Sequence, residues 1–156
     1  MAILEQDLLV ARQAWGEGLI AVSKKYESEG IESARKLASK MLDDLYGFDL
    51  GPVLFKPTKC EEMQFRPTKL DARSYFIAGD DRACTEDKGF AINPWTKVRF
   101  ENSNFILDEN RAIAMGNYFF TDTSGNEVKV EFTFGYKLID GNLKIDVHHS
   151  SFPYQQ

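Results

Sequence analysis

The two histidines of this 156-residue chain are adjacent near its end, and two serines follow them directly. They are His148 and His149, followed by Ser150 and Ser151, in the stretch KIDVHHSSFPYQQ. A neutral imidazole can accept a proton near pH 7, and hydroxyl groups can donate hydrogen bonds to charge that develops on a substrate oxygen. This stretch could therefore supply a general base and hydrogen-bond donors to one site.

The strand that carries these residues should separate them. Neighbouring side chains on a β-strand point to opposite faces. Residues 142–150 read as such a strand, and the row expected to face the interior consists of Leu143, Ile145 and Val147. His149 and Ser151 continue this inward row, so we expect His148 and Ser150 on the outer face. An isolated inward histidine is more often structural than catalytic, and strand-end serines more often cap backbone groups, so this pattern alone assigns no reaction.

A catalytic zinc site is not expected, because it needs three protein ligands that converge on one point. The two histidines diverge on the strand, and Cys60 and Cys84, the two thiols, have no metal-ligand spacing. We expect them to be reduced cysteines, and we expect no cofactor. A carboxylate site for a hard cation remains open, since the chain has 24 Asp and Glu residues.

The composition excludes several classes of partner. The formal net charge is −5, without a cluster of Lys and Arg, which argues against binding to nucleic acid. No apolar run approaches the length of a membrane span of about 18 residues. The first residues also lack the pattern of a secretion signal. We expect a cytoplasmic protein, and this expectation covers the chain as given, not an export signal removed from it.

The elements that would position the site form an α+β domain spanning residues 1–156. Apolar residues recur every three or four positions over residues 8–26 and 34–45, which predicts two helices, and residues 66–80 are compatible with a third. Residues 51–58 suggest a short strand. From Trp95 the period becomes two, which predicts strands over residues 95–102, 104–108, 111–122, 126–138 and 142–150. This order predicts helices packed on one face of a strongly curved antiparallel sheet.

Three stretches together resemble the iota class of carbonic anhydrases. They are residues 53–68 (VLFKPTKCEEMQFRPT), residues 86–102 (EDKGFAINPWTKVRFEN) and residues 114–154, which contain MGNYFFT and HHSSFPY. The resemblance implies the cone-shaped fold of ketosteroid isomerases and of the calcium/calmodulin-dependent kinase II association domain. It also implies hydration of CO2 to bicarbonate without a bound metal, and a homodimer formed through the outer face of the sheet.

The resemblance further implies that a threonine, a tyrosine, a histidine and a serine hold CO2 or bicarbonate with a water. The threonine falls at Thr58 and the tyrosine at Tyr75, while the histidine and serine fall within HHSS. Strand alternation then selects His149 as the base and Ser151 as its neighbour, with Ser150 as a further substrate contact. Three phenylalanines on strands could form apolar walls, namely Phe119, Phe132 and Phe134.

Two other functions stay open, because one fold hosts many activities. An isomerase or dehydratase acting on a larger apolar substrate would need a buried carboxylate base, and the predicted inward rows of the last two strands carry none. A non-catalytic association domain is the second alternative.

Overall fold

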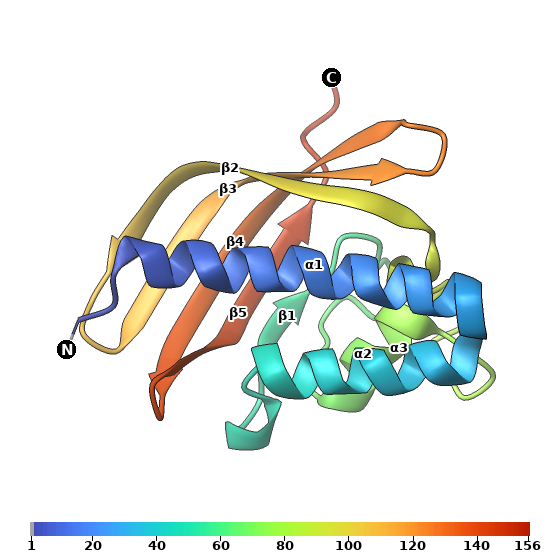
Figure 1. Ribbon diagram of the computed structural model, residues 1–156, viewed down its shortest axis with the longest axis horizontal. Coiled ribbons are helices and arrows are strands. Elements are labelled where there is room, and N and C mark those ends of the chain that lie inside the picture. Colours follow the sequence, from blue (N-terminus) through green and yellow to red (C-terminus); the bar gives the residue numbers. More distant parts are fainter. Residues whose placement is uncertain (1) are drawn as a thin grey trace.

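Three α-helices pack on one face of a curved five-stranded sheet (Figure 1). We describe residues 2–156 in a computed structural model of the chain. The strand order in the sheet is β1-β5-β4-β3-β2, in which β1 runs parallel to β5 and all other neighbours are antiparallel. The sheet is open, and the long strands curve around the helices. This confirms the predicted α+β class.

The predicted helices are present. Helix α1 spans Glu5–Glu29 and α2 spans Ile31–Leu45, and the two lie side by side, with α1 crossing in front of the sheet in Figure 1. Helix α3 spans Lys69–Ile77 and is capped at its N-terminus by Thr68, whose side chain accepts a hydrogen bond from the backbone N–H of Asp71. Two short 3₁₀ helices span Phe48–Leu50 and Phe90–Ile92. The apolar stripe of α1 is buried through Leu8, Trp15, Leu19 and Val22.

The strands are β1 (Leu54–Lys56), β2 (Trp95–Leu107), β3 (Arg111–Asp122), β4 (Glu127–Ile139) and β5 (Asn142–Ser151). The two segments predicted at 95–102 and 104–108 form one strand, β2, with a register irregularity between Asn102 and Asn104. An extra residue at this point changes which side chains face inward and so resembles a chain break in the sequence pattern. Alternation predicts that Val128, Val130, Phe132, Phe134 and Tyr136 form the inward row of β4. The last four are buried, and Val128 is partly buried.

Another register irregularity lies between β4 and β5 and decides the position of the site. Tyr136 of β4 pairs with Ile145, whereas the preceding Gly135 pairs with Val147, so Asp146 has no partner in the ladder. The extra residue reverses the alternation of side chains beyond it. Ile145 therefore faces the core before this point, and His148 faces it afterwards.

Candidate active site

A line of buried hydrogen bonds runs from His148 to Thr58. The Tyr118 hydroxyl lies 3.1 Å from His148 Nε2 and 2.5 Å from Ser150 Oγ. Ser150 Oγ in turn lies 2.6 Å from Thr58 Oγ1. His148, Tyr118 and Ser150 are each at most 2 % exposed. The four side chains therefore form one connected network inside the protein, built from β3, β5 and the segment after β1.

This network ends at a small cavity of about 10 Å³, close to the minimum volume that holds one water. The polar residues on its wall are Thr58, Tyr75, Tyr118, His148 and Ser150. The remaining wall is apolar and consists of Trp15, Phe55, Pro57, Phe76 and Phe90. The cavity thus combines several hydroxyl groups with a lining that suits an uncharged molecule.

A larger pocket of about 560 Å³ adjoins this cavity, because Tyr75 and Phe90 line both of them. Their rings are stacked, with 5.7 Å between centroids and 16° between planes. Lys59 and Lys88 lie on the wall of the outer pocket. The stacked pair therefore forms part of the wall between the cavity and the outer pocket.

Thr58 and Tyr75 reach the cavity from different elements. Strand β1 pairs with β5 so that Phe55 stands opposite His148 and Lys56 opposite His149, which brings the following Thr58 to the end of β5. Lys56 Nζ also donates a hydrogen bond of 2.9 Å to the carbonyl of Ser150. Tyr75 comes from α3, and its hydroxyl accepts a bond of 3.2 Å from the backbone N–H of Lys59.

A buried ion pair braces this side of the site. Arg66 donates two hydrogen bonds to Asp87, of 2.8 and 2.7 Å, and both side chains are fully buried. Ser74 Oγ donates a third bond to Asp87, and the Arg66 guanidinium lies 5.9 Å from the centre of the Tyr75 ring. Asp87 is thus a buried carboxylate, but Arg66 and Ser74 occupy both of its oxygens. It does not provide the free base that an isomerase or dehydratase would need.

Burial holds the titratable groups of the network in their neutral forms. It lowers the pKa of His148 to about 3, with a smaller contribution from His149. Burial also raises the pKa of Tyr75 and of Tyr118, against weaker opposing effects of their hydrogen bonds. The imidazole and the phenols are therefore uncharged at neutral pH.

The predicted faces of the last strand are wrong. His149 is exposed and Ser151 only partly buried, and both lie on the outer face of the sheet, where Ser151 Oγ donates to Glu131. His148 and Ser150 face the cavity instead, because the extra residue in β5 reverses the alternation. The structure does bring Thr58, Tyr75 and one His-Ser pair together as expected, but the pair is His148 and Ser150.

The three phenylalanines proposed as walls lie in different places. Phe119 is on the outer face, with the Arg99 guanidinium 3.8 Å from its ring centre, so it does not line the cavity. Phe134 packs on His148 with 4.2 Å between centroids, and Phe132 packs on Tyr118 at 5.2 Å. Both are buried and support the network from behind rather than forming the cavity surface.

Sequence reasoning missed the partners of the histidine. Tyr46 Oη lies 2.8 Å from His148 Nδ1, and Trp15 Nε1 donates to Tyr46 Oη at 2.9 Å. Since Tyr118 holds the other nitrogen, both nitrogens of His148 are engaged by tyrosines. The expected direct transfer of a proton from water to a histidine does not fit this arrangement. The available signal was tyrosine at positions expected to be buried, since a buried hydroxyl group usually has a hydrogen-bond partner. The sequence pattern does not say which of these hydroxyl groups contacts which partner.

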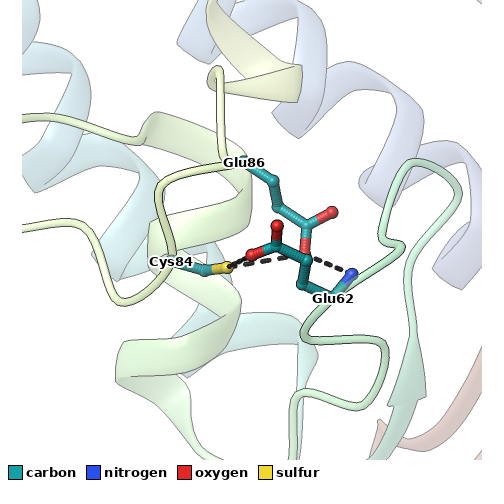
Figure 2. Close-up of side chains that lie close together, drawn as sticks. All are labelled: Glu62, Cys84 and Glu86. Carbon is teal, nitrogen blue, oxygen red and sulfur yellow. Dashed lines mark hydrogen bonds between the residues drawn. The ribbon is translucent and has the colours of Figure 1, made fainter.

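One group of potential metal ligands occurs within residues 2–156, on the loops near α3 (Figure 2). It consists of Glu62, Cys84 and Glu86, and it includes neither Cys60 nor a histidine. Glu86 accepts hydrogen bonds from the backbone N–H groups of residues 61, 62 and 63, and these bonds lower its pKa to about 2. The Glu86 carboxylate therefore connects its own loop, after α3, to the loop of residues 61–63.

Within the described residues, no helix has both the length and the apolar character needed to cross a lipid bilayer.

Comparison with known proteins agrees with the resemblance seen in the sequence. Residues 6–152 match the family model of metal-independent carbonic anhydrases. A metal-independent carbonic anhydrase from Nostoc sp. is 46% identical, over 99% of this chain and 76% of that protein. The crystal structure of a cyanobacterial iota-carbonic anhydrase complexed with bicarbonate has a TM-score of 0.96 and 46% identity, and covers 99% of this chain and 95% of that one.

The same fold also occurs in a protein of lower sequence identity. A putative calcium/calmodulin-dependent protein kinase II association domain from Xanthomonas campestris has a TM-score of 0.66 at 24% identity, over 99% of this chain and 95% of that one. At this identity the likeness concerns the fold alone. The family match and the 46% identical relatives, by contrast, extend over nearly the whole chain, so the chain belongs to the metal-independent carbonic anhydrase family.

Proposed function

We propose that this chain catalyses the reversible hydration of CO2 to bicarbonate in the cavity formed by Thr58, Tyr75, His148 and Ser150. The observation that carries the proposal is the line of buried hydroxyl groups that ends in a cavity with apolar walls. The bicarbonate complex of the 46% identical relative supports it, because that ligand is the product of the same reaction.

The cavity suits the two reactants in different ways. CO2 is uncharged and donates no hydrogen bond, so phenylalanine and proline walls bind it without a desolvation penalty. Water and bicarbonate need hydrogen-bond partners, which the hydroxyl groups provide. Because the cavity has room for about one water, CO2 enters when Tyr75 or Phe90 moves and opens a path from the outer pocket.

The proton can be transferred without a charged base. The oxygen of water attacks the carbon of CO2 while the water passes one proton to Thr58 Oγ1. The Thr58 hydroxyl gives its own proton to a CO2 oxygen at the same time, so the product is carbonic acid, which ionises to bicarbonate and a proton in solvent. A hydrogen bond from Tyr75 stabilises the charge that develops on oxygen, and Ser150 polarises the Thr58 hydroxyl through the hydrogen bond between them.

The serine pair of β5 offers a matched test by stopped-flow CO2 hydration on chelator-treated protein. Ser150→Ala interrupts the network and should lower kcat/KM by about 10²-fold, the usual effect of removing one such donor. Ser151→Ala makes the same change on the outer face and should leave the rate unaltered. A wild-type protein that fails to exceed the buffer rate, or equal rates for the two variants, would refute the proposed site.

A homodimer is part of the same proposal, with the outer face of the sheet as its interface. The helices cover the opposite face, and an apolar strip remains exposed on this one, made by Ile106, Ile113 and Met115. A groove of about 660 Å³ beside Met115 continues the surface to His149. Light scattering after gel filtration should give the dimer mass for the wild type and the monomer mass for Met115→Lys. A monomeric wild type would contradict this interface.

A further inference from the structure

The hydrogen-bond network continues behind His148, away from the cavity. Tyr46 follows α2 and forms an isolated β-bridge with Ile145 of β5, which places its ring beside the imidazole. The Tyr46 hydroxyl is fully buried and lies between Trp15 Nε1 at 2.9 Å and His148 Nδ1 at 2.8 Å. Six side chains are thus connected in one line of hydrogen bonds, namely Trp15, Tyr46, His148, Tyr118, Ser150 and Thr58.

Trp15, at one end of this line of hydrogen bonds, determines which partner donates in each bond. An indole N–H can donate a hydrogen bond but cannot accept one. The Tyr46 oxygen therefore accepts from Trp15, and its own hydrogen must find another acceptor. Within residues 2–156 the available acceptor is His148 Nδ1. If Nδ1 carried the proton instead, the Tyr46 oxygen would receive two donors and its buried hydrogen would have no acceptor, which is unfavourable inside the protein.

The remaining bonds follow from this starting point. A neutral histidine carries one ring proton. With Nδ1 accepting from Tyr46, this proton is on Nε2 and is donated to Tyr118. Tyr118 then donates to Ser150, and Ser150 donates to Thr58. The hydrogen of Thr58 is left at the end of the line, where the cavity lies.

We propose that Tyr46 is a positioning residue that holds His148 in the Nε2–H tautomer and so directs the hydroxyl hydrogens of the network toward the substrate. Its importance for catalysis rests on the proposed function, whereas the tautomer itself does not. Aligned hydrogen bonds polarise one another, so the Thr58 hydroxyl becomes a stronger donor than an isolated threonine. In the opposite direction, Thr58 would donate into the protein and could not give its proton to a CO2 oxygen.

The ¹⁵N resonances of the imidazole report the tautomer directly, because a protonated and an unprotonated ring nitrogen have well-separated shifts. The measurement is made in His149→Gln protein, where every imidazole signal belongs to His148. His149 is exposed on the outer face, so this background should keep the wild-type rate. We expect a protonated Nε2 and an unprotonated Nδ1 at neutral pH.

Tyr46→Phe removes the hydrogen-bond donor to His148 Nδ1, so the protein no longer determines which ring nitrogen carries the proton. The signals should then show a mixture of both tautomers, and kcat should fall about tenfold, as expected from one lost buried hydrogen bond of about 1.4 kcal/mol. Tyr136→Phe is the matched control, because the Tyr136 hydroxyl is also buried but has no hydrogen-bond partner among residues 2–156. This variant should keep both the Nε2–H tautomer and the wild-type rate.

The wild-type spectrum alone can overturn the inference, whether or not Tyr46→Phe folds, since a protonated Nδ1 would contradict the assigned direction. An Nε2–H tautomer and an unchanged rate in Tyr46→Phe would also refute the role of Tyr46. If the tautomer shifts in Tyr46→Phe as expected but the wild type does not hydrate CO2, the proposed function fails while the role of Tyr46 in fixing the tautomer is supported.

Discussion

His148 and His149 are neighbours in the chain, but their imidazoles lie on opposite sides of the sheet. His148 is 2 % exposed and stacks on Phe55 with 4.8 Å between ring centroids. His149 is exposed beside the groove of the outer face. The dipeptide therefore provides one candidate catalytic residue and an internal control for it.

Replacement of each histidine by phenylalanine should separate the two roles. His148→Phe keeps a ring that can stack on Phe55 but loses two buried hydrogen bonds of about 1 kcal/mol each, which corresponds to a decrease in kcat/KM of about 30-fold. His149→Phe should retain the wild-type rate. Stopped-flow CO2 hydration measures both, with near-ultraviolet circular dichroism to confirm folding. A larger loss for His149→Phe would overturn the assignment.

His148 should also make stability dependent on pH. Its pKa is about 3 in the folded protein and 6.5 as the ordinary value. Between these values the unfolded chain binds the extra proton, so the free energy of unfolding falls as the pH decreases, by at most about 1.4 kcal/mol per pH unit from this group. Urea unfolding at about pH 7 and about pH 5 should show a smaller decrease for His148→Phe than for the wild type. Equal decreases would mean that His148 is not held neutral.

Gly135 permits the strand irregularity that turns His148 inward. A Cβ atom at this position would lie 2.8 Å from Val147 Cβ and 3.0 Å from Val147 Cγ2. Gly135→Ala should therefore push β5 away from β4 and lower the free energy of unfolding by about 1–3 kcal/mol. The rate of CO2 hydration should fall as well, because His148 and Ser150 follow on the same strand. Gly141→Ala is the contrasting variant, because a Cβ atom added there has no other atom within 4 Å. The positive φ of Gly141 would strain an alanine, but that strain lies in an exposed hairpin turn. A Gly135→Ala protein with wild-type stability and activity would contradict this explanation.

The Arg66–Asp87 pair should be essential for the fold around Tyr75. Asp87→Asn leaves the buried guanidinium without its counter-charge and should lower the free energy of unfolding by about 3–5 kcal/mol. Asp81→Asn is the control, because Asp81 is 58% exposed in its pairs with Arg35 and Arg73, and it should cost less than about 1 kcal/mol. Chemical denaturation measures both. Similar small losses would show that the buried pair does not brace the site.

The helices and strands could be predicted from local patterns. The spacing of Leu8, Trp15, Leu19 and Val22 marks one face of a helix, and the alternation from Val130 to Tyr136 marks one face of a strand. These patterns arise because each element buries one face, so they are visible within a few residues of sequence. Family-specific motifs likewise point to Thr58, Tyr75 and the HHSS stretch, because each motif is a short contiguous run of residues.

The assignment of faces on β5 depended on tertiary structure. Simple alternation predicts His149 inside, but the shift between Gly135 and Val147 reverses it. Whether a strand accommodates an extra residue depends on its neighbour and on the packing between them, and β5 alone carries no clear sign of it. Local periodicity therefore located the His-Ser pair in the sequence but selected the wrong face.

The sequence by itself determined the α+β class, the elements, the family and the region that contains the site. Tertiary structure decided that His148 and Ser150 face the cavity, that Phe119 does not, and that Tyr46 and Tyr118 hold the two nitrogens of the imidazole. Secondary structure reflects interactions between residues that are close in the chain. The hydrogen bonds of the site join residues that are far apart in the chain, and their geometry exists only once the helices and the sheet have packed together.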